Sequence, residues 1–147
     1  MMILGFGWTW PALFATGELQ KTVTRRKWIN SHAKKFKAGA LVSAYNKAPM
    51  YGGQKIGIIR IQVVPYKENI KNMPDSDYYA EGFAYLAGPG NHLLPASMPI
   101  GVTREGFEEW KKSKQKYWVV RFEVVELDEA FLENYQHKVI LEGGNLK

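Results

Sequence analysis

The residues best suited to chemistry lie in one short segment of the chain, GELQKTVTRRK. In an extended strand alternate side chains share a face, so Thr22, Thr24 and Arg26 would lie on the same side. A face that carries two hydroxyls and a guanidinium could bind an anion or a polar ligand. Lys21 is three positions from Thr24, so their side chains converge only if Lys21 lies in a turn before the strand. Gly17 makes such a tight reversal feasible.

Basic residues are concentrated in the same part of the chain. The net charge is +6, and seven lysines and arginines lie between positions 21 and 37 with no acid among them. Residues 38–147 are neutral, with 13 basic and 13 acidic residues. A local basic patch is the electrostatic footprint of a phosphate-bearing partner, although a solvated basic face has the same composition. The seven residues are Lys21, Arg25, Arg26, Lys27, Lys34, Lys35 and Lys37.

The length and composition are those of an ordinary globular domain. The chain has 147 residues, of which 46% are hydrophobic and 23% charged, so we expect a single domain over 1–147. It contains no cysteine, which excludes disulfides and thiolate metal sites. Its histidines, His32, His92 and His137, have no metal-ligand spacing, and we expect neither a metal nor another cofactor.

The sequence also bears on location. Its apolar stretches are far shorter than a membrane span, and its N-terminus lacks the basic segment of a secretory signal. We therefore expect a cytoplasmic protein with no membrane partner. The oligomeric state is not predicted by any pattern in the chain.

The hydrophobic pattern predicts a sheet with few helices. Apolar residues that alternate or run together predict strands at 2–6, 22–27, 41–45, 54–64 and 117–127. Spacing and capping residues predict helices at 11–16, 75–86 and 104–114, with a short one after Asp128. Residues 87–103 predict a long loop, and the tail from Gly143 a frayed end. Because most strands meet through short connections, we expect an α+β fold, a mostly antiparallel β-barrel with short helices packed across its ends.

Four of the tryptophans divide into two groups by their surroundings. Trp8 and Trp10 either belong to the core or offer flat faces on which a nucleobase could stack. Trp110 and Trp118 lie in a predicted helix and in the most apolar predicted strand, and we expect both to be core residues.

The order of several motifs resembles the ASCH domain, a family of the PUA-like superfamily. The run from Gly17 through KTVTRR is followed by FKAG before a strand, by EGF at Glu81, by Phe107 and Trp110, and by YWVVRFE from Tyr117. The resemblance covers about residues 2–126 and leaves 127–147 as a C-terminal extension. It implies a PUA-like β-barrel with a basic cleft that binds RNA or a nucleotide.

The same resemblance implies a candidate enzyme activity. One branch of small bacterial ASCH proteins consists of amidohydrolases that remove the acyl group from N4-acetylcytidine, and its lysine, threonine and glutamate match Lys21, Thr24 and Glu81 here. A threonine hydroxyl needs an adjacent base. A lysine can be that base only if burial or a cation such as Arg26 lowers its pKa. A paired carboxylate would raise that pKa, so we expect Glu81 not to pair tightly with Lys21 but to bind the cytosine amino edge or move a proton.

Two function classes remain open at this point. The first is a module that holds RNA or a modified nucleotide in a basic cleft. The second is an N4-acylcytidine amidohydrolase, which hydrolyses a C–N amide bond. A neutral nucleoside gains little from seven positive charges, so the charge favours the binding module. The predicted ligand contacts are Trp8, Thr22, Arg25, Arg26, Lys27, Lys34, Lys35 and Lys37.

Overall fold

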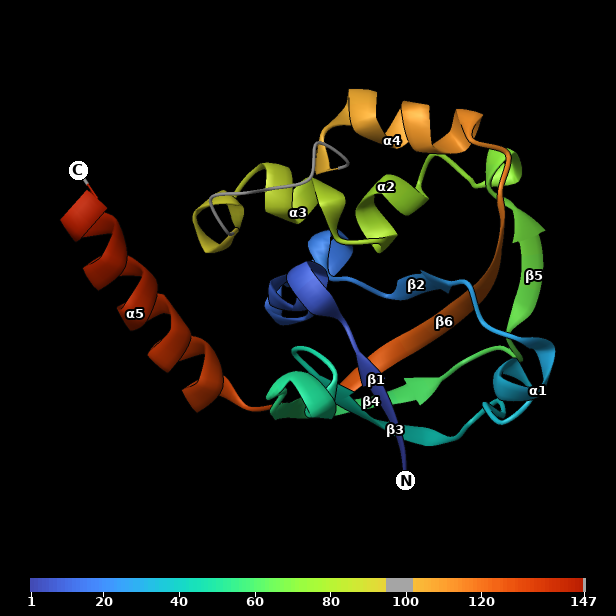
Figure 1. The fold of residues 1–147 in the computed structure, drawn as a ribbon, viewed down its shortest axis with the longest axis horizontal. Helices are drawn as coiled ribbons and strands as arrows, with labels where there is room; N and C mark the ends of the chain where they lie inside the picture. The colour runs from blue at the N-terminus through green and yellow to red at the C-terminus, as the bar shows by residue number, and fades with distance from the viewer. Residues whose placement is uncertain (95–101, 147) are drawn as a thin grey trace.

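The computed structural model describes residues 1–94 and 102–146, with side chains as far as residue 141 (Figure 1). Within these residues one sheet has the strand order β1-β3-β4-β6-β2, and β5 pairs with β6 off this path. β1 and β3 are parallel, and the other neighbours are antiparallel. The strands are β1 (Met2–Gly5), β2 (Val23–Arg26), β3 (Leu41–Tyr45), β4 (Lys55–Ile61), β5 (Tyr66–Asn69) and β6 (Lys116–Leu127).

The long strand β6 shapes the sheet. Its C-terminal half pairs with β4, and its N-terminal half pairs with both β2 and β5. Register shifts at Ala44/Tyr45 and Ile58/Ile59 bend β3 and β4, as bulges do. The result is a mixed sheet curled into half a barrel, with short helices around it, which is the expected α+β class.

Helices α2, α3 and α4 lie together over one side of the curled sheet, whereas α5 runs outward from the end of β6 (Figure 1). Within the described ranges, none of the helices combines the length and the apolar composition that crossing a membrane requires. The helices are η1 (Gly7–Phe14), η2 (Gly17–Leu19), α1 (Asn30–Ala33), η3 (Pro49–Tyr51), η4 (Ile70–Asn72), α2 (Asp77–Ala80), α3 (Phe83–Ala87), η5 (Asn91–Leu93), α4 (Arg104–Lys112) and α5 (Glu129–Leu146).

The core has two parts, and the site described below lies where they meet. One part packs the inner faces of β1, β3, β4 and β6 against η1, and includes Phe6, Trp10 and Phe122. The other packs α2, α3, η4 and α4 together, and includes Phe83 and Phe107. The segment from β1 through η1 contributes to both parts, because Phe6 packs in the first and Trp8 against the second.

Several predicted elements differ from the structure. The predicted helix 75–86 is two helices, because Gly82 adopts a left-handed φ of +92° between α2 and α3. The segment after Asp128 is an 18-residue helix that continues through Gly143, rather than a short helix and a frayed tail. Strand β5 and helix α1 were not predicted. The predicted loop 87–103 contains η5, and its residues 95–101 lie outside the described ranges.

Candidate active site

Lys21 lies in the turn between η2 and β2, the placement that its convergence with Thr24 requires. Its backbone N–H donates to the carbonyl of Ala12 in η1 (2.9 Å), and its side chain is 1% exposed. The ammonium Nζ donates to the backbone carbonyl of Glu81 (2.8 Å) and to Glu81 Oε1 (3.3 Å). Lys21 is therefore a fixed, buried side chain and not a solvated turn residue.

Glu81 lies at the junction of α2 and α3 and is almost fully buried. Its Oε1 accepts from Lys21, and its Oε2 accepts from Arg25 Nη1 (2.7 Å). We expected Glu81 not to pair tightly with Lys21, but the two side chains form a buried ion pair with 3.3 Å between Nζ and Oε1. The physical reason is that the left-handed turn at Gly82 places Glu81 beside Lys21, where the backbone carbonyl of Glu81 also accepts from the ammonium.

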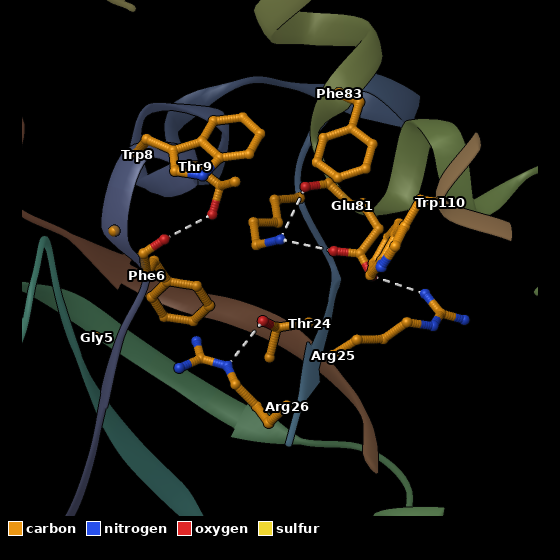
Figure 2. Close-up of a pocket in the computed structure, with 12 residues that line it drawn as sticks. Gly5, Phe6, Trp8, Thr9, Thr24, Arg25, Arg26, Glu81, Phe83 and Trp110 are labelled. Atoms are coloured by element: carbon orange, nitrogen blue, oxygen red, sulfur yellow. Dashed lines mark hydrogen bonds and ion pairs between the residues drawn. The ribbon is translucent and has the colours of Figure 1, made fainter. Parts of the chain in front are cut away.

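Thr24 and Arg26 project from β2 toward the same pocket (Figure 2). Arg26 Nε donates to Thr24 Oγ1 (3.1 Å), and the guanidinium lies over the ring of Phe6, 5.5 Å from its centroid. Among the described residues, no carboxylate forms an ion pair with Arg26. Burial lowers the pKa of Arg26 to about 10, which leaves the guanidinium charged at neutral pH.

The pocket that these side chains share has a volume of about 460 Å³. Its polar groups are those of Lys21, Thr24, Arg26 and Glu81 together with Thr9 and Arg25. Its apolar wall is aromatic, since Trp8 stacks on Phe83 with ring centroids 5.7 Å apart and planes at 10°, and Trp110 closes the far side. Such a wall suits a planar ring, and the polar groups converge on one end of it.

The ionisation of Lys21 depends on several competing effects. Burial is the largest, and it lowers the pKa of Lys21 below its ordinary value of 10.5. Glu81 acts in the opposite direction, and the positive charges of Arg26 and Arg25 add to the lowering. The net direction is downward, so the amine is a stronger candidate for a general base than an exposed lysine would be. No hydrogen bond joins Lys21 to Thr24 among the described residues, so a base and nucleophile pair would have to form on ligand binding.

Sequence reasoning did not find a buried row of charges that continues from Glu81. Arg25 donates to Asp77 (2.6 Å) and to Glu68 (3.1 Å) as well as to Glu81. Asp77 in turn accepts two bonds from Arg121, of 3.1 and 2.9 Å. The arginine at 121 lies within the YWVVRFE motif, but no local pattern indicated that it faces a carboxylate 44 positions away.

The predicted ligand contacts separate into different places. Thr22 faces a separate hollow of about 380 Å³ that also exposes Arg121, so it does not share the pocket with Thr24 and Arg26 as predicted. The reason is that Thr22 precedes β2, where strand alternation does not yet apply. Arg25 lines the pocket, and its guanidinium also forms ion pairs with the three carboxylates Glu68, Asp77 and Glu81.

The remaining lysines are exposed and outside the pocket. Lys27 lies over the ring of Tyr117, with Nζ 5.5 Å from the centroid, and the others flank α1. The basic run is therefore divided between a buried network, the pocket and an exposed surface. These exposed lysines are Lys27, Lys34, Lys35 and Lys37.

Two tryptophan predictions also change. Trp110 is half-buried and lines the pocket, so it is not a core residue as expected. Trp118 is likewise half-buried in β6. Trp8 lines the pocket and stacks on Phe83 while packing against the second part of the core, whereas Trp10 is in the core itself. In the described part of the chain, no three histidine or acidic side chains are grouped as metal ligands.

Comparison with known proteins adds little. No protein-family model matches the chain, and no curated protein matches it. A solved structure with a similar arrangement is protein EF3133 from Enterococcus faecalis V583, of the family DUF984. It is 19% identical, with a TM-score of 0.43 over 75% of this chain and 67% of that chain. A similarity at this level says nothing about what the pocket does.

Proposed function

We propose that the pocket is the active site of an amidohydrolase that removes the acyl group from an N4-acylated cytosine nucleoside. The supporting observation is that a buried lysine of lowered pKa and a threonine hydroxyl that accepts a hydrogen bond from Arg26 line one aromatic-walled pocket. The finer description of the fold, the PUA-like barrel of an ASCH domain, belongs to the same proposal, because it rests on the same motifs.

In the first half-reaction Thr24 is the nucleophile. Its Oγ forms a bond to the acyl carbon, and its proton passes to the neutral amine of Lys21. The carbonyl electron pair moves to oxygen, where the guanidinium of Arg26 stabilises the negative charge. The C–N bond then breaks, and Lys21 returns the proton to the departing N4 of cytosine. The products are the free nucleoside and an acyl ester on Thr24.

The second half-reaction is hydrolysis of that ester. Water attacks the acyl carbon while Lys21 removes its proton, and Lys21 then returns the proton to Thr24 Oγ as the carboxylic acid departs. Glu81 does not contact the substrate in this scheme. The two N–H groups of the neutral amine donate to the carbonyl and to Oε1 of Glu81, so the lone pair remains available to accept the proton.

The pocket also accounts for binding of the base. A cytosine ring fits against the stacked pair Trp8 and Phe83, with Trp110 at its edge. The volume of about 460 Å³ accommodates one base and a short acyl chain, but not a folded oligonucleotide.

Hydrolysis of N4-acetylcytidine tests the proposal directly. The purified protein is incubated with N4-acetylcytidine, and cytidine release is followed by chromatography. Thr24→Ala should abolish turnover, Thr24→Ser should retain it in part, and Thr22→Ala should match the wild type, because Thr22 lies outside the pocket. No turnover by the wild type, or turnover that survives Thr24→Ala, would refute the proposal.

RNA binding is the second candidate, and the exposed lysines favour it. Lys27, Lys34, Lys35 and Lys37 are exposed on the segment that leads away from the pocket along β2 and α1. They would meet phosphates of an RNA whose modified base enters the pocket. In that case affinity for an RNA oligomer falls steeply with salt, by an exponent close to the number of phosphates contacted. A salt-independent titration would count against this candidate.

A further inference from the structure

Six buried or half-buried charged groups form one connected row beneath the pocket. Starting from the pocket, Lys21 is bonded to Glu81, Glu81 to Arg25, Arg25 to Asp77, and Asp77 to Arg121. Glu68 from β5 forms a branch, because it accepts from the same Nη2 of Arg25 that serves Asp77. We call these six residues the charge row. It joins β2, β5, β6 and the junction of α2 and α3.

When Lys21 is protonated, the charges of the row cancel. Lys21, Arg25 and Arg121 are balanced by Glu68, Asp77 and Glu81, which leaves Arg26 as the cation of the pocket without a carboxylate partner in the described chain. In a buried and balanced row each group competes for its neighbours, so a change at one end alters the hydrogen bonds at the other.

We propose that Arg25, Asp77, Glu68 and Arg121 are positioning residues that set how tightly Glu81 holds the amine of Lys21. The proposal rests on the function above in that Lys21 is taken as the base. Arg25 holds Glu81 Oε2 at 2.7 Å, which is shorter than the 3.3 Å between Lys21 and Oε1. The carboxylate is therefore pulled away from Lys21 by a guanidinium whose own position is fixed by Asp77 and Glu68.

Arg121 is the residue that fixes the far end of the row. Its guanidinium binds both oxygens of Asp77, and its Nε donates to the hydroxyl of Tyr66 (3.0 Å). This two-pronged contact requires the planar fork of arginine, which lysine cannot reproduce. Arg121 is half-buried and contacts neither Lys21 nor Glu81, so a substitution there tests transmission along the row.

The direction in which each substitution shifts the pKa of Lys21 follows from the hydrogen bonds of the charge row. Removing Arg121 takes away one partner of Asp77, so Asp77 neutralises Arg25 more fully. Arg25 then attracts Glu81 less strongly. Glu81 turns toward Lys21, and the pKa of Lys21 rises. Removing the charge of Glu68 leaves Arg25 more positive, so it draws Glu81 away and that pKa falls. The charged groups that act on Lys21 in the described chain are Glu81, Arg26 and Arg25, and the facing residues of η1 carry no charge.

The experiment measures the pKa of Lys21 without requiring turnover. The ¹³Cε signals of the lysines are titrated by NMR, and Lys21 is identified as the signal that Lys21→Met removes. The expected shifts are upward in Arg121→Gln and downward in Glu68→Gln. Arg60→Gln and Glu123→Gln make the same charge changes in an exposed ion pair and should leave the signal unmoved.

Arg121→Lys separates positioning from a simple electric field. It keeps the positive charge but loses the pair of hydrogen bonds to Asp77. If Arg121 acts by positioning Asp77, the pKa of Lys21 should rise by nearly as much as in Arg121→Gln. The proposal would be overturned if the pKa of Lys21 in Arg121→Lys equalled that of the wild type. It would also be overturned if that pKa shifted in the same direction in Arg121→Gln and Glu68→Gln. Both sites are only half-buried, so we expect these variants to be less destabilised than variants at the buried Arg25 or Asp77.

The outcome is independent of the proposed activity. If N4-acetylcytidine is not hydrolysed but the NMR shifts have the expected signs, the row positions a binding lysine rather than a catalytic one. If the protein is active, the acid limb of kcat/KM against pH moves with the NMR value, to higher pH in Arg121→Gln and to lower pH in Glu68→Gln. If the protein is active but the pKa of Lys21 is the same in both variants as in the wild type, the positioning role of the charge row is refuted and the proposed function stands.

Discussion

Replacing Glu81 by glutamine tests the buried charges apart from any assumption about function. Glu81→Gln keeps the size of the side chain and removes one negative charge between Lys21 and Arg25. Arg25 retains two carboxylate partners, Asp77 and Glu68, whereas Lys21 retains no carboxylate partner in the described chain and keeps only uncharged acceptors such as the backbone carbonyl of residue 81 at 2.8 Å. The cost of the substitution therefore falls mainly on the buried ammonium.

The magnitude follows from the burial of the two partners. Removing one member of a buried ion pair destabilises a protein by about 3–5 kcal/mol. Because Arg25 stays paired and Lys21 can lose its proton, we expect the lower end, about 3 kcal/mol at pH 7, or about 10 °C in Tm for a domain of this size. Glu123→Gln, in a pair whose side chains are 44% and 46% exposed, should cost at most about 1 kcal/mol.

The pH dependence of this loss supplies a second check. The pKa of Lys21 in the folded protein lies below 10.5, its ordinary value in the unfolded chain. Between the folded and the unfolded pKa the unfolded chain binds the proton more tightly, so the free energy of unfolding rises with pH. In Glu81→Gln the folded pKa falls further, so the window in which stability recovers widens. The free energy of unfolding is measured by urea titration at several pH values. A loss under about 1 kcal/mol, or equal losses at the two glutamates, would refute the reasoning.

Three further predictions concern other parts of the site. Gly82→Ala should cost about 2–3 kcal/mol in urea titrations, because φ is +92° and the new Cβ would lie 2.5 Å from a methyl group of η1, whereas Gly17→Ala, at φ +59° in open space, should cost about 1 kcal/mol. Arg26→Gln should lower kcat about 10²–10³-fold and move the acid limb of kcat/KM to higher pH, since Arg26 lowers the pKa of Lys21; an unmoved limb would contradict this. Burial raises the pKa of Asp77, but hydrogen bonds from Arg121 and Arg25 outweigh it and lower that pKa below 3.8. The stability of the wild type should therefore fall as the pH drops through the lowered pKa. Asp77→Asn should remove this acid dependence, measured as urea midpoints at several pH values.

Part of the site could be predicted because it depends on local chain geometry. The turn that carries Lys21 and the strand that carries Thr24 and Arg26 follow from a glycine and a short extended run, and they are only a few residues apart. Their relative placement is fixed by φ and ψ of that run, so no distant contact had to be known. The α+β class was predictable for the same reason, because strand and helix periodicities are local.

The pairing of Lys21 with Glu81 could not be predicted, because it depends on how a left-handed glycine divides one expected helix into two. The helical pattern of residues 75–86 is continuous in sequence, and the break appears only when Gly82 packs against η1. The basic run was also misjudged as one surface. Counting charges along a chain does not tell which of them meet carboxylates from β5, from α2 and from the junction of α2 and α3 in the fold.

The sequence by itself determined the residue types of the site and their order along β2, since these need only the alternation and turn chemistry of a short segment. Tertiary structure alone decided which charges are neutralised and which remains open to the pocket. The physical reason is that burial and Coulomb interaction act through space over a few ångströms, and the carboxylates that balance Lys21 and Arg25 come from positions 43 to 60 residues away.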